Sequence, residues 1–128
     1  MPISYRLDPH PDDAELRALW QAAWSDAHPA SFAPMLARSL VHAGAYDGAA
    51  LIGYVNVASD GGIHAFLLDT TVHPHYRRRG IATELVALVT SAARARGAGW
   101  LHVDYEPHLA GFYRACGFRH TEAGLIAL

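Results

Sequence analysis

The chain has 128 residues, 52% of them hydrophobic, and a formal net charge of −2 with histidine neutral. This length predicts a single domain, residues 1–128, that buries a sizeable core. No apolar run approaches the roughly 20 residues of a membrane span, and the N-terminus lacks a signal-peptide layout. The prediction is therefore a soluble cytoplasmic protein. Its slightly acidic balance excludes a general attraction to nucleic acid or anionic membranes.

Residue usage narrows the chemistry further. All ten basic residues are arginines, so no lysine can act as a nucleophile or form a Schiff base. The only cysteine, Cys116, cannot form an internal disulfide, and we interpret it as a packing residue. The histidine pair His73 and His75 has no cysteine partners and no cluster of acidic residues nearby, so no metal site is predicted.

The first forty residues predict a strand and two helices. Residues 3–7 alternate as a strand, and Asp12 followed by Glu15 has the spacing of a capping box at a helix start. Ser31 is expected to cap a short second helix that reaches Leu40. Four residues of this region are expected either to line a pocket or to belong to the core: Trp24, Asp26, His28 and Phe32.

Three strands should follow as an antiparallel meander. The Asp47–Gly48 pair is typical of a hairpin turn between residues 41–46 and 50–58. A second glycine-containing turn leads into a strand over residues 63–72. A strand predicted over residues 100–105 follows a helix, so it should run parallel to the strand that ends at Val72. The C-terminal ends of two parallel neighbours form a crevice suited to a ligand.

The stretch 72–83 joins the third strand of the meander to an amphipathic helix that is expected to end at Gly97. A helix N-terminus carries unpaired N–H groups and partial positive charge. Here three arginines precede it, while Gly80 and Ala82 leave room beside the backbone. This pattern predicts a phosphate-binding turn. The P-loop pattern is excluded because it needs a lysine, and the dinucleotide fingerprint because it needs three spaced glycines.

The end of the chain predicts one more helix and two strands. Pro107 is suited to the first helical turn, and Gly117 should end the helix. One face of this helix carries Leu109, Phe112, Tyr113 and Cys116. Closing strands are expected at residues 118–121 and 124–128.

Arg77, Gly80 and Ala82 satisfy the pattern Arg/Gln-x-x-Gly-x-Gly/Ala, and a second characteristic block runs from Phe112 to Phe118. On these blocks the chain resembles the GNAT superfamily of acyl-CoA-dependent N-acetyltransferases, over about residues 65–118. The resemblance implies an α/β fold with a mixed, mostly antiparallel sheet of about seven strands, a parallel splayed pair and about four helices. It also implies acetyl-CoA as co-substrate and direct acetyl transfer to a primary amine of a small molecule or peptide.

The resemblance implies roles for individual residues. The pyrophosphate would be held by Arg77, Arg78, Arg79, Gly80, Ile81, Ala82 and Thr83. Backbone N–H groups at Thr70, Thr71 and Val72 would hold the thioester oxygen and the pantetheine amides. Tyr113 would act as general acid, or as a hydrogen-bond donor, toward the departing thiolate. The alternative for Tyr113 is that it only completes the apolar face of its helix.

The general base is left unassigned. Some family members have a glutamate where this chain has Phe66, which cannot accept a proton. The candidates are therefore Asp69, Glu106 and His108. Family members often have an asparagine at the position of Glu106, so a carboxylate there could bind a cationic amine or simply be a solvated helix start.

Two other functions stay open at this point. One is an acyl-CoA-binding regulatory module without catalysis, which is expected if Tyr113 is buried and the acceptor cleft is closed. The other is an acetyltransferase acting on aminoacyl-tRNA, which the acidic charge balance disfavours. The identity of the acceptor and the formation of a homodimer are left open.

Overall fold

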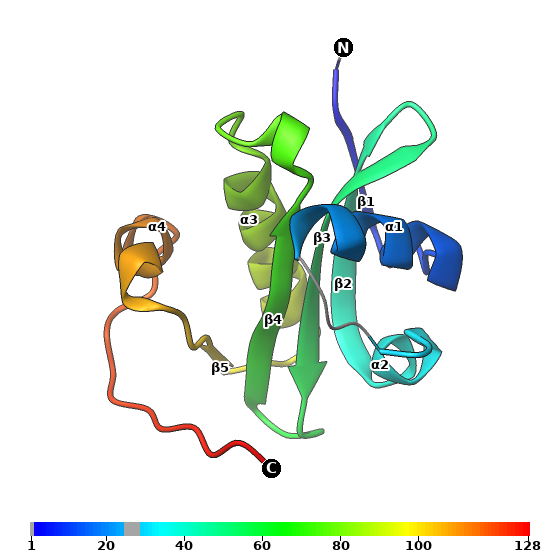
Figure 1. Cartoon of the computed structure of the whole chain (residues 1–128). Coiled ribbons are helices and arrows are strands. Elements are labelled where there is room, and N and C mark those ends of the chain that lie inside the picture. Colours follow the sequence, from blue (N-terminus) through cyan, green and yellow to red (C-terminus); the bar gives the residue numbers. More distant parts are fainter. Residues whose placement is uncertain (1, 25–28) are drawn as a thin grey trace.

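In a computed structural model, which describes residues 2–24 and 29–128, helices cover both faces of a mixed sheet (Figure 1). Within the described residues the sheet has five strands, ordered along it as they are in the chain. They are β1 (Ser4–Leu7), β2 (Ser39–Asp47), β3 (Ala50–Ser59), β4 (His64–Val72) and β5 (Trp100–His102). The first four pair antiparallel, and β5 runs parallel to β4. The predicted meander and parallel pair are thus confirmed.

Helix α1 (Asp13–Ala23) begins with the predicted capping box. The Asp12 carboxylate accepts a hydrogen bond from the Glu15 N–H at 2.8 Å, and the Glu15 carboxylate accepts one from the Asp12 N–H at 3.3 Å. Two of the N–H groups at the helix start are thereby satisfied.

Helix α2 (Ala33–Ala37) is shorter than predicted, and Phe32 rather than Ser31 occupies its N-cap. The Ser31 hydroxyl still accepts the Ala33 N–H at 3.3 Å, one position outside the predicted cap. Leu40 lies in β2 instead of the helix, because pairing with β3 already begins at Ser39. Inter-strand hydrogen bonding satisfies the backbone there in place of a longer helix.

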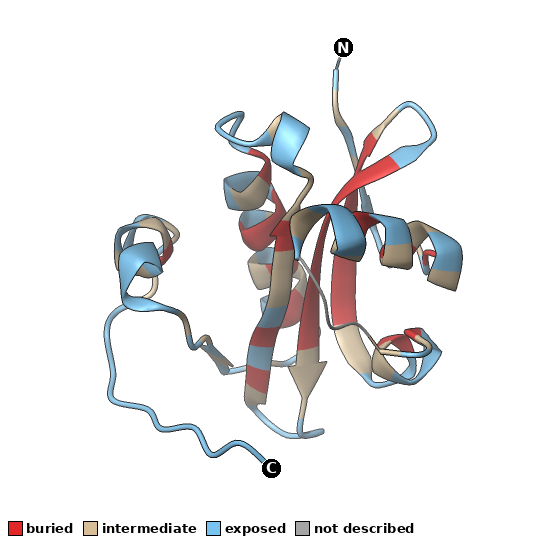
Figure 2. Cartoon of the chain, viewed as in Figure 1, coloured by how far each residue is buried: buried red, intermediate tan, exposed pale blue. Residues whose placement is uncertain are grey.

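Two apolar layers hold the sheet between the helices. On one face, α3 (Ile81–Ala95) packs on β2, β3 and β4 through Ile81, Leu85, Val86, Val89 and Ala93. On the other face, α1 and α2 cover β2 and β3 through Leu16, Leu19, Phe32 and Leu36. The most deeply buried parts are accordingly the central strands and the inner side of α3 (Figure 2). Burying each of the larger apolar side chains among them contributes about 1.5–3 kcal/mol.

Gly53 of β3 sets how closely α3 approaches the sheet. A Cβ at Gly53 would lie 3.1 Å from Leu85 Cδ1 and 3.2 Å from Ile81 Cγ2. A larger residue would therefore push the first turns of α3 outward, and the N-terminus of the helix would move with them.

Glycines end both of the later helices as predicted. After α3, the N–H groups of Gly97 and Ala98 donate to the carbonyl oxygens of Arg94 and Ala93, and Gly97 has φ +102°. The 3-10 turn at Pro107–Leu109 leads into α4 (Ala110–Ala115), and Gly117 and Phe118 repeat the same arrangement after it. Both ends are Schellman motifs, in which the glycine adopts the left-handed conformation.

The two predicted closing strands are wrong. Residues 118–128 form no helix or strand, and Leu125, Ile126 and Leu128 are exposed (Figures 1 and 2). The physical reason is that the segment pairs with no strand, because the sheet of the described residues ends at β5. Without a paired neighbour the alternating pattern does not form a strand.

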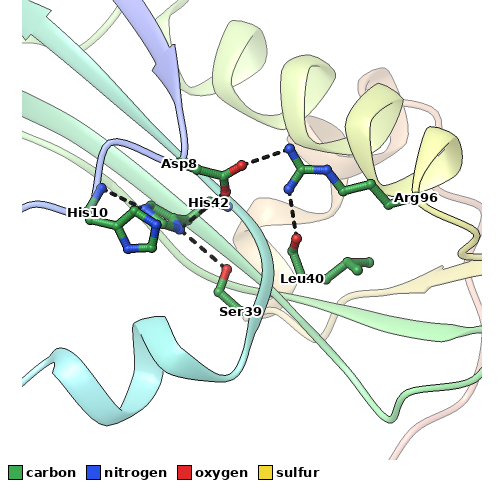
Figure 3. A network of polar contacts seen from close by, with 6 residues as sticks. All are labelled: Asp8, His10, Ser39, Leu40, His42 and Arg96. Atoms are coloured by element: carbon green, nitrogen blue, oxygen red, sulfur yellow. Dashed lines mark hydrogen bonds and ion pairs between the residues drawn. The ribbon is translucent and has the colours of Figure 1, made fainter.

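A polar network joins β1, β2 and the C-terminal end of α3 (Figure 3). Arg96 forms an ion pair with Asp8 at 2.7 Å and donates to the Leu40 carbonyl at 2.8 Å. The buried His42 accepts the His10 N–H at Nε2, so the proton of its neutral ring lies on Nδ1. None of the residues in this network lines the cavity described below.

No helix in the described part of the chain combines the length and apolar character needed to cross a membrane.

Candidate functional site

The parallel pairing of β4 with β5 stops at Phe66 and His102, although β4 continues to Val72. The predicted splayed pair is therefore present. A cavity of about 480 Å³ is bounded by the free end of β4, the start of α3 and the segment around α4. Its lining residues are Ala23, Trp24, Thr70, Thr71, Val72, Arg77, Arg78, Ile81, Ala82, Glu106, His108, Leu109, Phe112 and Tyr113.

One end of the cavity is the predicted phosphate-binding turn. Gly80 is the N-cap of α3 with φ +76°, and Ile81 and Ala82, the first two helical residues, line the cavity. The Arg77 and Arg78 side chains line the same end. No atom lies within 4 Å of the position that a Gly80 Cβ would take. A helix N-terminus with two guanidinium groups and an open backbone approach is suited to a pyrophosphate.

Three of the predicted phosphate-binding residues do not line the cavity: Arg79, Gly80 and Thr83. The Arg79 guanidinium lies over the Tyr76 ring, 5.4 Å from its centroid. Tyr76 in turn donates a hydrogen bond to Asp47 at the β2–β3 turn. Arg79 thus contacts the rim of the fold, whereas Gly80 shapes the turn through its backbone.

β4 contains a bulge beside the cavity. Tyr54 pairs with Thr71 and Asn56 with Leu68, so Asp69 and Thr70 together face the single residue Val55. Asp69 has φ +60°, a left-handed conformation that is unusual for a residue with a side chain. A bulge interrupts the ladder and redirects N–H groups. Thr70, Thr71 and Val72 of this segment line the cavity.

Tyr113 also lines the cavity and contacts the β4 bulge. Its ring is only 7% exposed, yet its hydroxyl donates a hydrogen bond to Thr70 Oγ1 at 3.5 Å. Burial raises the pKa of the Tyr113 hydroxyl, and the hydrogen bond to Thr70 opposes this shift only in part. A raised pKa makes full proton transfer harder, so the geometry suits hydrogen bonding to a developing thiolate.

The three candidates for the general base differ in their position relative to the cavity. Glu106 and His108 line the cavity, and the Glu106 side chain forms no capping hydrogen bond at the 3-10 turn that it precedes. Asp69 lies behind the wall, and burial raises the pKa of its carboxyl group. Phe66, at the position where some relatives have a glutamate, stacks on His102 at a centroid distance of 4.8 Å.

Asp69 also borders a buried polar cluster. The Tyr54 hydroxyl and the Asn56 side-chain oxygen are both buried without a hydrogen-bond partner among the described residues. Burial and then the negative charge of Asp69 raise the pKa of Tyr54. Asp69 and Tyr54 thus lie close enough for their charges to interact, and burial affects both groups.

Trp24 is a cavity residue that the sequence pattern left undecided. It follows the last residue of α1, is 48% exposed, and its indole N–H donates to Thr71 Oγ1 at 3.1 Å. Phe32 is fully buried and belongs to the core. Asp26 and His28 lie outside the described residues.

Four lining residues escaped prediction as site residues: Ala23, Leu109, Phe112 and, as a definite assignment, Trp24. They are apolar, and apolar side chains on amphipathic helices indicate a core with or without a neighbouring cavity. Cys116 packs against the core as predicted, and burial raises the pKa of its thiol. Within residues 2–24 and 29–128, no group of three or more histidine, cysteine or acidic side chains could hold a metal ion.

A mixed sheet whose parallel pair parts beside a helix N-terminus defines the class of acyl-CoA-dependent acetyltransferases with the GNAT fold. The family model for the GNAT acetyltransferase family matches residues 7–118, and the chain belongs to this family. Acetyl-CoA is the co-substrate that this fold uses.

Similar proteins agree with this assignment. Mycothiol acetyltransferase from Mycobacterium ulcerans is 37% identical over 60 residues, 47% of this chain, and the matched part spans about a fifth (19%) of that relative. A GNAT family acetyltransferase from Streptococcus pneumoniae TIGR4 superposes with a TM-score of 0.85 at 26% identity, covering 99% of this chain and 98% of that one.

The aminoglycoside acetyltransferase AAC(6')-Iy has been solved with the bisubstrate analog CoA-S-monomethyl-acetylneamine. It superposes with a TM-score of 0.75 at 21% identity, covering 100% of this chain and 98% of that one. At this identity the likeness shows the fold alone.

Proposed function

We propose that this protein transfers the acetyl group of acetyl-CoA to a primary amine of a small molecule or peptide, by direct attack in a ternary complex. The observation that carries the proposal is the position of the Tyr113 hydroxyl. It touches Thr70 at the β4 bulge, on the wall of a cavity whose other end is the arginine-lined N-terminus of α3. A phosphate-binding end and a hydroxyl donor at the bulge are the two contacts that an acyl-CoA thioester needs.

The cofactor contacts follow from this arrangement. Arg77 and Arg78, with the N–H groups at Ile81 and Ala82, bind the pyrophosphate. The N–H groups of Thr70, Thr71 and Val72 hold the thioester oxygen and the pantetheine amides. The remaining predicted residues contribute through the shape of the turn (Gly80) or at its rim (Arg79, Thr83).

The transfer step then proceeds without an acyl-enzyme. The amine nitrogen forms a bond to the thioester carbonyl carbon, and the carbon–sulfur bond breaks. The Tyr113 hydroxyl donates a hydrogen bond that stabilises the leaving thiolate, and the thiolate then takes its proton from solvent. The amine proton leaves to Asp69, directly or through water, and Glu106 attracts a cationic amine into the cavity.

The burial of the Tyr113 ring supports a second candidate, a non-catalytic acyl-CoA-binding regulatory module. In that case the tyrosine completes the apolar face of α4, stacking on Tyr105 at a centroid distance of 5.0 Å. An open cavity of about 480 Å³ beside the hydroxyl favours the enzyme.

The deciding experiment compares wild type with Tyr113→Phe. Isothermal titration measures the affinity for acetyl-CoA and CoA, and thiol release measures turnover with a panel of primary amines. Removing one hydroxyl should lower kcat at least about tenfold while leaving acetyl-CoA affinity nearly unchanged, because the hydroxyl acts on the leaving sulfur.

Equal turnover by both proteins would make Tyr113 a packing residue. Tight acetyl-CoA binding without turnover of any amine would instead support the regulatory module, and no binding of acetyl-CoA or CoA would overturn both candidates.

A further inference from the structure

Trp24 makes a contact that the proposed reaction does not yet use. Its indole N–H reaches across from the end of α1 and donates to Thr71 Oγ1 at 3.1 Å. The Thr71 hydroxyl in turn donates to the Asp69 carbonyl oxygen at 2.8 Å. Thr71, which takes part in both hydrogen bonds, is only 2% exposed.

This chain of hydrogen bonds connects residues on both sides of the bulge. Asp69 and Thr70 are the two residues that face Val55, and Asp69 is held at φ +60°. Such a conformation persists only where neighbouring groups determine it. The bond from Thr71 back to the Asp69 carbonyl spans the two bulged residues and ties one end of the bulge to the other.

The Trp24 N–H decides which way the Thr71 hydroxyl points. A hydroxyl has one hydrogen to donate and two lone pairs to accept with. The indole N–H can only donate, so it occupies a lone pair and leaves the hydroxyl hydrogen for the Asp69 carbonyl. Without Trp24 the hydroxyl is free to rotate, and the bulge loses one of its constraints.

We infer that Trp24 is a positioning residue for acetyl transfer. Through Thr71 it holds the β4 bulge in the conformation that aims the N–H groups of Thr70–Val72 at the thioester oxygen. The inference rests on the proposed function for the role of these N–H groups. The new element is that the end of α1, which also lines the cavity, controls the geometry of these N–H groups.

A double-mutant cycle tests this link. Trp24→Phe keeps an aromatic ring and removes the N–H, while Thr71→Val removes the hydroxyl at nearly constant volume. Each should lower kcat about 10- to 100-fold with little change in acetyl-CoA affinity. Because both changes break the same chain of bonds, the double variant should be about as slow as Thr71→Val alone.

Two controls separate positioning from a general loss of structure. Thr71→Ser restores the hydroxyl and should recover most of the activity. Trp20→Phe makes the same substitution one turn earlier on α1, where the ring packs on Phe32 at 5.3 Å, and should turn over at the wild-type rate. Multiplicative losses in the double variant, or a Trp24→Phe enzyme with unchanged kcat, would overturn the inference.

A spectroscopic measurement keeps this test apart from the test of the proposed function. Acetyl-CoA labelled with ¹³C at the acetyl carbonyl should show a shifted carbonyl resonance, and a lowered C=O stretch, when bound to the wild type. In Trp24→Phe and Thr71→Val both signals should move back toward those of free acetyl-CoA. This result would support the inference even if no amine is acetylated. Signals unchanged by either substitution would count against it whatever the turnover.

Discussion

Asp69 combines two unfavourable properties in one residue. Its backbone is left-handed without being glycine, and burial raises the pKa of its carboxyl group. An ordinary structural residue would gain nothing from either property, but a general base benefits from a pKa closer to neutral. Strain and desolvation beside a cavity are typical of functional positions.

Asp69→Asn should therefore lower turnover and remove a group from the ascending limb of the kcat/KM profile against pH. The sign follows from the raised pKa, since Asp69 must be deprotonated to accept the amine proton, and activity should rise as pH passes through its pKa. Rate measurements across the acidic range test this. Acetyl-CoA affinity should not change.

The same variant should be more stable than the wild type at neutral pH. For an acid whose folded pKa is raised, stability falls as pH rises through that pKa, because the folded state resists ionisation. Asparagine removes the charge and so removes this loss. A lower thermal midpoint for Asp69→Asn at pH 7, together with an unchanged pH profile of the rate, would show that Asp69 is structural.

The conformations and contacts of single residues could be predicted from the sequence only in part. The turn at Gly80 could be predicted because glycine itself signals a left-handed conformation. The conformation of Asp69 could not, since it arises from the mismatch between β3 and β4, a property of pairing rather than of local sequence. Trp24 was equally hidden, because its partner Thr71 lies far away in the chain.

At the scale of elements, the site is the meeting of β4, α3 and α4. Helix α3 contributes its N-terminus, and Gly53 lets that end approach the sheet closely. β4 contributes the bulge, and the 3-10 turn with α4 contributes Glu106, His108 and Tyr113. All three elements lie within residues 7–118, the part of the chain that the family model matches.

Replacing Arg77 and Arg78 together by alanine should weaken CoA binding roughly 10²- to 10⁴-fold, because each of the two charge-assisted hydrogen bonds contributes about 1.5–3 kcal/mol. Binding of an acetyl-pantetheine fragment without the pyrophosphate should change little. Calorimetry at two salt concentrations measures both, and CoA affinity for the wild type should fall with added salt.

The matched control is Arg17→Ala with Arg38→Ala, which changes the net charge equally away from the cavity. Equal losses for CoA and the fragment, or equal losses in the control, would show that the arginines at the turn act only through the general charge of the protein.

Strand ends and closing elements were the weakest element-scale predictions. The pattern at residues 118–128 alternates like a strand, but a strand forms only against a partner edge, and β5 offers three paired residues on its other side. After the Schellman motif that ends α4, residues 118–128 do not pair with the free edge of β5. The local sequence does not determine whether a segment finds a strand to pair with.

Across the whole molecule, acid sensitivity should come from the network of Asp8, His42 and Arg96 (Figure 3). Burial lowers the pKa of His42, although Asp8 opposes the shift and His10 and Arg96 reinforce it. Burial opposes ionisation of Asp8, yet hydrogen bonds from Arg96 and the His42 N–H hold the pKa of its carboxyl below the usual value. Both shifts favour the network at neutral pH.

Stability should accordingly fall as pH drops below about 6.5, the ordinary pKa of histidine. The unfolded chain then binds a proton at His42 that the folded state resists, because protonated Nε2 cannot accept the His10 N–H. The Asp8 contribution is lost at lower pH, below about 4. Urea unfolding from pH 7 to pH 5 measures the first loss.

His42→Gln keeps an acceptor for the His10 N–H and removes the titrating ring. Its unfolding free energy should depend less on pH between 7 and 5 than that of the wild type. Because Asp69 shifts stability in the opposite direction and is present in both proteins, it cancels in the comparison. Parallel pH dependences in the two proteins would assign the acid sensitivity to other groups.

The bond between Asp8 and Arg96 also bears on how fast the protein unfolds. It joins the first strand to the end of α3, so most of the chain must be ordered before the two charges meet at 2.7 Å. A contact with such a long loop closure tends to form after the folding transition state. Arg96→Gln should therefore increase the unfolding rate a few-fold, roughly, and leave the folding rate almost unchanged. Stopped-flow folding and unfolding in urea would reveal this as a shift of the unfolding arm alone; a slower folding arm would place the contact in the folding nucleus.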